Sequence, residues 1–210
     1  MSDDHQLRRV PGGKDLETAG SICLDVNANN VTIDGNGKTI TMTAGGDAFA
    51  VKMNDPSDVN QRWHDISISN VISPTGGFST YSDVAHITVD HVTIAGVSSL
   101  SSHYITVTNS TINGPVSFSS LGTNNSSYTI FTGNTVTGNS DRLAVFAGDA
   151  HTLNNCDTSG FTINNNTFTD TIDVINNNPV NVFLACMQNG SFNGNTVIST
   201  GEATGTLVRD

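Results

Sequence analysis

The segment Ile87-Thr-Val-Asp-His-Val-Thr-Ile94 decides the fold, because the chain repeats it 18 residues later as Ile105-Thr-Val-Thr-Asn-Ser-Thr-Ile112. In each copy, apolar and polar residues alternate up to Val89 or Val107, a polar turn follows, and the alternation has resumed by Ile94 or Ile112. Alternation turns one side chain inward and the next outward along a β-strand. Each copy therefore predicts two short strands separated by a tight polar turn.

The same unit recurs along most of the chain. Its last apolar residue before the turn, which we call the anchor, is found at Ile33, Ile68, Val89, Val107, Phe131, Ile163 and Phe192. Most intervals between anchors hold a third apolar segment, at residues 48–53, 116–118, 143–146 and 180–185. A single unit of this kind cannot bury its apolar face, but stacked units bury a continuous core. We therefore expect an all-β solenoid of about seven coils, each with three short strands.

This arrangement resembles the right-handed parallel β-helix of the pectin-lyase-like superfamily over about residues 21–200. The segment Ser21-Ile-Cys-Leu-Asp-Val-Asn-Ala-Asn-Asn-Val-Thr-Ile-Asp-Gly-Asn-Gly-Lys-Thr-Ile40 is similar to the first coil of that superfamily. The resemblance implies one β-helix domain over residues 21–210, preceded by an N-terminal cap or flexible arm over residues 1–20. It also implies a stacked ladder of turn residues formed by Asn70, Asn109 and Asn165.

The composition fits this assignment. Asn, Thr, Ser and Gly make up 94 of 210 residues, and the repeat places Thr and Ser on outward strand positions and Asn and Gly in turns. Eight Lys and Arg against 19 Asp and Glu give a net charge of -11, which excludes a nucleic-acid binder and disfavours anionic polysaccharides. No apolar run approaches the ~20 residues of a membrane helix, and no signal peptide is recognisable.

The candidate site follows from the turns after the first strand of each unit, where the resemblance places enzyme chemistry. Candidate catalytic residues in or beside these turns are Asp55, Asp58, Asp83, His64 and His86. Candidate substrate-binding residues, which combine aromatic faces with polar groups suited to sugars, are Trp63, Arg62, Tyr81, His103, Tyr104 and Tyr128. If the coils are in register, these side chains would stack along one edge.

Other polar groups point to no further chemistry. No two carboxylates align on the first strand of the units, and we interpret Asp34 and Asp90, which follow their anchors, as solvated side chains. The histidines His64, His86 and His103 stand at different offsets from their anchors, so no metal site and no cofactor are expected.

The cysteines leave two alternatives open. Their count is three, which is too few for a disulfide scaffold. Cys156 and Cys186 fall at nearly equivalent places in neighbouring units and could form a stacked pair or a disulfide. Alternatively, these residues and Cys23 are buried free thiols.

Three functional hypotheses remain. The first is a non-enzymatic surface or virion protein of tail-spike, fibre or decoration type, extracellular or on a virion, with a neutral glycan as candidate ligand. Its expected partners are further copies in a homotrimer, or other virion proteins that cap the C-terminal end. The second is a pectin-lyase-like polysaccharide lyase or glycoside hydrolase. The third is an ice- or surface-binding protein, suggested by the outward column Thr32, Ser67, Thr88, Thr106, Thr162 and Ser191, which Ile130 interrupts. The fold alone cannot choose among them.

Overall fold

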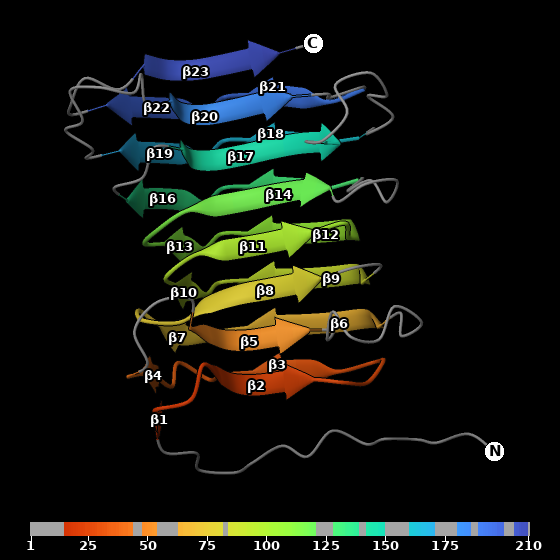
Figure 1. Ribbon diagram of the computed structural model, residues 1–210, viewed down its shortest axis with the longest axis vertical. Coiled ribbons are helices and arrows are strands. Elements are labelled where there is room, and N and C mark those ends of the chain that lie inside the picture. The colour runs from red at the N-terminus through yellow and green to blue at the C-terminus, as the bar shows by residue number, and fades with distance from the viewer. Residues whose placement is uncertain are drawn as a thin grey trace.

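The computed structural model describes residues 15–43, 48–53, 63–81, 84–120, 128–138, 142–149, 160–170, 180–185, 189–199 and 204–209. Within these ranges every regular element is a β-strand, so the described residues contain no helix that could span a membrane. Figure 1 shows the strands stacked one above another, with the chain climbing from the N-terminus at one end to the C-terminus at the other. The all-β solenoid that the repeat predicts is confirmed.

Three long parallel sheets form the sides of the solenoid. The first sheet contains β2 (Ile22–Val26), β5 (Phe49–Met53), β8 (Gly77–Tyr81), β11 (Val97–Leu100), β14 (Val116–Ser120), β17 (Arg142–Asp149), β20 (Val180–Ala185) and β23 (Thr204–Arg209). The second contains β3 (Thr32–Asp34), β6 (His64–Ser69), β9 (Ala85–Asp90), β12 (His103–Thr108), β15 (Ile130–Thr132), β18 (Thr162–Asn164) and β21 (Ser191–Asn193). The third contains β7 (Ile72–Ser73), β10 (Thr93–Ile94), β13 (Thr111–Ile112), β16 (Thr135–Gly138), β19 (Thr167–Asp170) and β22 (Thr196–Ser199).

The chain visits the three sheets in a fixed order. From β2 to β22 it completes seven coils, and β23 adds a further strand to the first sheet. In Figure 1 the first-sheet strands run from left to right in front and the chain returns behind them while it rises, so the helix is right-handed. At the N-terminal end, β1 (Leu16–Thr18) pairs with β4 (Ile40–Met42), and a bridge between Thr39 and Ile72 joins that coil to the third sheet.

The anchors set the register of the second sheet. Each one pairs with the anchor of the next coil, in the order Ile33, Ile68, Val89, Val107, Phe131, Ile163 and Phe192. Most of these side chains are buried, because alternate residues of each strand point into the solenoid. The spacing between anchors varies along the chain, but the register of the second sheet follows the sequence repeat.

Phenylalanine rings fill the core of the later coils. Phe146 lies at the centre of this group and contacts Phe118, Phe131, Phe161 and Phe168, with ring centroids 5.4 to 6.5 Å apart. All five rings are fully buried. Burial of each such side chain stabilises the fold by about 1.5–3 kcal/mol, so this group holds the upper coils together.

The turn asparagines correct one expectation from the sequence. Asn70, Asn109 and Asn165 adopt positive φ of 50 to 57° and point to solvent, and the hydrogen-bonded ladder is formed by other asparagines. They occupy this position because Asn tolerates the left-handed conformation better than most residues. Asn70 and Asn109 each donate a side-chain hydrogen bond to a carboxylate of the preceding coil, Asp34 and Asp90 respectively.

This ladder lies one residue further along the turn, at the buried Asn134 and Asn166 and the half-buried Asn195, and we call it the buried ladder. The Oδ1 atom of each later residue accepts from the backbone N–H and from Nδ2 of the residue one coil earlier, as in Asn134 N to Asn166 Oδ1 at 2.9 Å. Each Nδ2 also donates to a strand carbonyl of the preceding coil, as in Asn166 Nδ2 to Phe131 O at 2.8 Å. A left-handed residue precedes each ladder asparagine, namely Gly133, Asn165 and Gly194, and the asparagine that follows it points inward.

Asp90 is held in a hydrogen-bonded corner rather than being simply solvated. It accepts from Thr108 Oγ1 at 2.6 Å and from Asn109 Nδ2 at 3.0 Å, and His91 Nδ1 lies 2.6 Å from its other oxygen. The hydrogen bond from Thr108, more than those from His91 and Asn109, lowers the pKa of Asp90 below its usual value. The ionised carboxylate therefore favours the folded state.

This network predicts an acid-sensitive component of stability. A lowered pKa in the folded state contributes stability at neutral pH and loses it as the pH falls below about 5, through the usual aspartate range. Asp90→Asn and Thr108→Val should therefore both flatten the dependence of the free energy of unfolding on pH in this acid range, measured by urea unfolding. If the free energy of unfolding depends on acid pH equally in the wild type and both variants, the role given to the Asp90 hydrogen bonds is contradicted.

The cysteines are only partly within the described residues. Cys23 is half-buried in β2, and burial raises the pKa of its thiol. The expected pairing of Cys156 with Cys186 lies outside the described residues.

Candidate binding site

A column of left-handed residues runs along the start of the second sheet. Each member stands three residues before an anchor and has a positive φ between 53° and 83°. We call it the left-handed column, and its members are Asn30, Asp65, His86, Tyr104, Tyr128, Gly160 and Asn189. At Asp65, His86, Tyr104 and Tyr128 the reversed backbone leaves the side chain exposed, while the next residue is buried.

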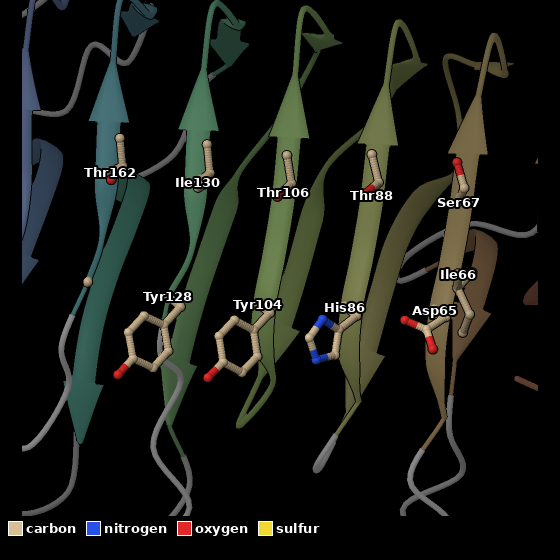
Figure 2. Close-up of a pocket in the computed structure, with 11 residues that line it drawn as sticks. Asp65, Ile66, Ser67, His86, Thr88, Tyr104, Thr106, Tyr128, Ile130 and Thr162 are labelled. Atoms are coloured by element: carbon tan, nitrogen blue, oxygen red, sulfur yellow. The ribbon is translucent and has the colours of Figure 1, made fainter. Parts of the chain in front are cut away.

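Three members of this column form an exposed row of aromatic rings. The rings of His86 and Tyr104 stack with centroids 4.7 Å apart and planes within 10°. Those of Tyr104 and Tyr128 lie 4.8 Å apart and within 2°. Figure 2 shows the three rings side by side on neighbouring strands, with both tyrosine hydroxyls pointing the same way. Tyr104 is 46% exposed and Tyr128 is 48% exposed, so about half of each tyrosine side chain in the aromatic row is open to solvent.

Backbone preference does not explain these tyrosines. A bulky side chain at positive φ costs roughly 1–2 kcal/mol relative to the right-handed conformation. Elsewhere in the same column the chain uses residues that tolerate this conformation, namely Asn30, Gly160 and Asn189. Strained residues of this kind gather at functional sites, where the strain is retained for another purpose. The aromatic row is therefore the strongest functional signal on the described surface.

A second column, made of Ser and Thr side chains except at Ile130, lies beside the aromatic row, and we call it the hydroxyl column. Its members follow the left-handed column by two residues and pair across the coils in the order Ser67, Thr88, Thr106, Ile130 and Thr162. The two columns line an open hollow of about 700 Å³ that extends over five coils, as Figure 2 shows. The hollow therefore combines ring faces with hydroxyl groups that can donate and accept hydrogen bonds.

The two ends of the row differ. At one end stands Asp65, whose Oδ2 atom lies 2.7 Å from Nδ1 of His64. At the other end stands Gly160, where a Cβ atom would lie 2.7 Å from Cδ1 of Tyr128. The missing side chain gives the last tyrosine ring room to lie over the backbone of the next coil. The row thus ends at a carboxylate on one side and at a glycine backbone on the other.

The structure brings together only part of the predicted site. His86, Tyr104 and Tyr128 all line the hollow. His64 and His103 stand one residue earlier, each opposite Ala85, and are not among the residues that line it.

The other predicted residues lie elsewhere. Tyr81 ends β8 in the first sheet and pairs with Leu100. Trp63 is half-buried, packs against the core, and has its indole N–H buried with no acceptor among the described residues. Asp55, Asp58, Arg62 and Asp83 lie outside the described residues.

Sequence reasoning missed Asp65 and Gly160 as parts of the site. Both could have been found by counting three residues back from the anchors Ile68 and Ile163, which is the offset that His86, Tyr104 and Tyr128 share. The count has a physical basis, because residues at one offset from the anchors occupy one column of a solenoid in register.

The charged groups of the hollow are few. Asp65 is the one carboxylate among the lining residues, and these residues include no Lys or Arg. Within the described residues, no group of three His, Cys, Asp or Glu side chains is placed to hold a metal ion. The hollow can therefore stack a ring and exchange hydrogen bonds, but its lining lacks the two carboxylates that most glycoside hydrolysis requires.

Comparisons with known proteins return no relative. No protein-family model, no curated protein and no solved structure matches the chain. The function of the protein is therefore inferred from the surface of this solenoid. The pectin-lyase-like resemblance stays a prediction.

Proposed function

We propose that the protein is a non-enzymatic surface protein that binds a neutral glycan along the aromatic row. The observation that carries the proposal is the pair of exposed tyrosines, Tyr104 and Tyr128, held at positive φ and stacked in parallel. A setting on a virion surface or fibre, in several copies, would multiply weak single contacts into useful avidity. That setting and the pectin-lyase-like relationship are parts of the proposal.

The chemistry of a sugar fits this surface. A pyranose ring has an apolar face of C–H groups and a rim of hydroxyls. An aromatic ring takes the apolar face, and nearby hydroxyls and carboxylates exchange hydrogen bonds with the rim. Thr88 and Thr106 lie on the strands that carry His86 and Tyr104, so both kinds of contact are available on neighbouring coils.

An enzymatic alternative has weaker support. The His64–Asp65 contact of 2.7 Å beside the hollow has the form of an acid–base pair. However, the same contact between sequence neighbours recurs at Asp90 and His91, at 2.6 Å and away from the hollow. The recurrence indicates that adjacent Asp and His side chains pair readily on this scaffold, so the contact needs no catalytic explanation.

The proposal is tested by native gel electrophoresis in gels that contain soluble neutral polysaccharides: hydroxyethylcellulose, galactomannan, xyloglucan and dextran. We expect at least one of them to retard the wild-type protein. Tyr104→Asn should weaken this retardation about 10-fold or more in affinity, because one ring face is lost. Asparagine suits the left-handed position, as Asn30 and Asn189 show, so the variant should remain folded.

Ile198→Ala is the matched control, because Ile198 is also an exposed apolar side chain but lies on the third sheet. It should bind as the wild type does. Equal retardation of the wild type and Tyr104→Asn in every gel would refute the proposal. Absence of glycan binding together with thermal hysteresis in freezing assays would favour the ice-binding hypothesis instead.

A further inference from the structure

The geometry points to a ligand of one shape and charge: an uncharged, equatorially linked glycan chain that lies along the axis of the solenoid and is anchored at Asp65. This inference rests on the proposed function, which it makes more specific. It concerns the direction of the chain, the residue that holds one end of it, and the class of glycan that is rejected.

The direction follows from the arrangement of the two columns. The left-handed column and the hydroxyl column both run from coil to coil, across the strands, and the hollow includes members of five consecutive coils. Five coils are separated by four spacings of about 4.8 Å, so the hollow spans roughly 19 Å from the first coil to the last. A chain aligned with the solenoid axis contacts every ring of the row, whereas one aligned with a strand contacts a single ring.

The linkage follows from the straight, regular arrangement of the aromatic row. The planes of Tyr104 and Tyr128 agree within 2°, and that of His86 agrees with Tyr104 within 10°. Because the rings recur at one spacing and in one orientation, successive sugars can each contact the row only if the glycan is extended and straight. Equatorial β-1,4 linkages give an extended, flat chain of this kind, whereas α-1,4 linkages give a curved one.

The anchor is the carboxylate of Asp65. Its side chain is 55% exposed, and the contact with His64 engages only Oδ2. Among the described residues, no group makes a hydrogen bond to Oδ1. Figure 2 shows a carboxylate oxygen of Asp65 pointing along the row toward His86. A sugar hydroxyl that lies over His86 can therefore donate to this oxygen, and a hydrogen bond to a charged acceptor is stronger than one to a neutral acceptor.

The same carboxylate selects against anionic chains. No Lys or Arg lines the hollow to compensate the negative charge of a uronate, and the protein as a whole carries a net charge of -11. A carboxylate on the ligand would therefore meet repulsion from Asp65 and from the overall field of the protein. Neutral chains avoid this repulsion and keep the hydrogen bond.

The test is isothermal titration of the wild type, Asp65→Asn and Tyr104→Asn with three probes: cellohexaose, its C6-oxidised uronate form, and maltohexaose. Cellohexaose should bind the wild type at least ~10-fold more tightly than either other probe. Asp65→Asn should weaken cellohexaose binding about fivefold and should narrow the preference for the neutral probe. Glu17→Gln is the matched control, because it removes the same charge on β1, outside the hollow, and should change neither value.

The outcomes separate this inference from the proposed function. If cellohexaose binds in a Tyr104-dependent way but Asp65→Asn behaves like Glu17→Gln, the anchor is refuted and the glycan-binding function stands. Preference for maltohexaose or for the uronate probe, again dependent on Tyr104, overturns the ligand class but not the site. Binding of every probe without any dependence on Tyr104 overturns both.

Discussion

Replacing Asn166 with alanine is expected to lower the free energy of unfolding by about 4 kcal/mol, a large share of the 5–15 kcal/mol typical of a domain. Asn166 is buried, and its side chain takes part in four hydrogen bonds that cross coils. Alanine leaves the backbone N–H of Asn134 and the carbonyl of Phe131 buried without these partners. Each such group costs roughly 1–3 kcal/mol when it is left unpaired.

Urea unfolding followed by circular dichroism measures this loss. Asn165→Ala is the matched control, because Asn165 is the preceding residue, is exposed, and lies outside the buried ladder. It should cost only about 1 kcal/mol, from the poorer fit of alanine to a positive φ. A loss in Asn166→Ala no larger than that of the control would show that the buried ladder does not stabilise the solenoid as described.

Replacing Tyr104 and Tyr128 together by asparagine should abolish measurable glycan binding while the solenoid stays folded. Two ring faces are removed, which corresponds to about a 100-fold loss of affinity. The effect on folding should be small, within about 1 kcal/mol, because the lost ring stacking is offset by relief of two unfavourable backbone conformations. Stability and function are therefore expected to separate at these two positions.

Affinity electrophoresis and urea unfolding on the same preparation check both halves of this prediction. Phe131, the anchor that follows Tyr128, provides the contrasting variant, because its ring is buried against Phe118 and Phe146. Phe131→Leu should lower stability without changing affinity in the protein that remains folded. If the double tyrosine variant unfolds instead, the rings are structural and the site has been misassigned.

The sequence predicted the solenoid well because its anchors repeat a physical constraint. A residue such as Val89 or Val107 must face the core in every coil, so apolar alternation ending at a polar turn recurs and reveals the register. Spacing between anchors varies from 18 to 35 residues, yet the pairing is unaffected. Turns can lengthen on the outside of a solenoid at little cost to the stacked strands.

The buried ladder was misplaced by one residue for a reason that sequence alone does not show. Several turns carry consecutive asparagines, as at Asn164, Asn165 and Asn166, and composition does not reveal which one points inward. The backbone decides it: the left-handed conformation of Asn165 directs that side chain outward and the next one into the core.

The aromatic row was only partly predictable. The aromatic side chains of Tyr104 and Tyr128 predict them as sugar-binding residues. Their alignment with His86 follows because all three stand at the same offset from their anchors. The positive φ at this offset could not be predicted, because tyrosine disfavours that conformation and gives no sequence signal for it. Asp65 carries no aromatic ring that would mark it in the sequence, and only its backbone position shows that it stands at the end of the row.

The central claim is that a glycan lies on the row formed by Tyr104 and Tyr128. The most direct measurement is nuclear magnetic resonance of tyrosine rings labelled with carbon-13, since the chain has three tyrosines and the third, Tyr81, lies in the first sheet as an internal reference. On titration with cellohexaose, the ring signals of Tyr104 and Tyr128 should shift together while that of Tyr81 stays in place. Binding that leaves both row tyrosines unshifted, or that shifts Tyr81 alone, would contradict the account.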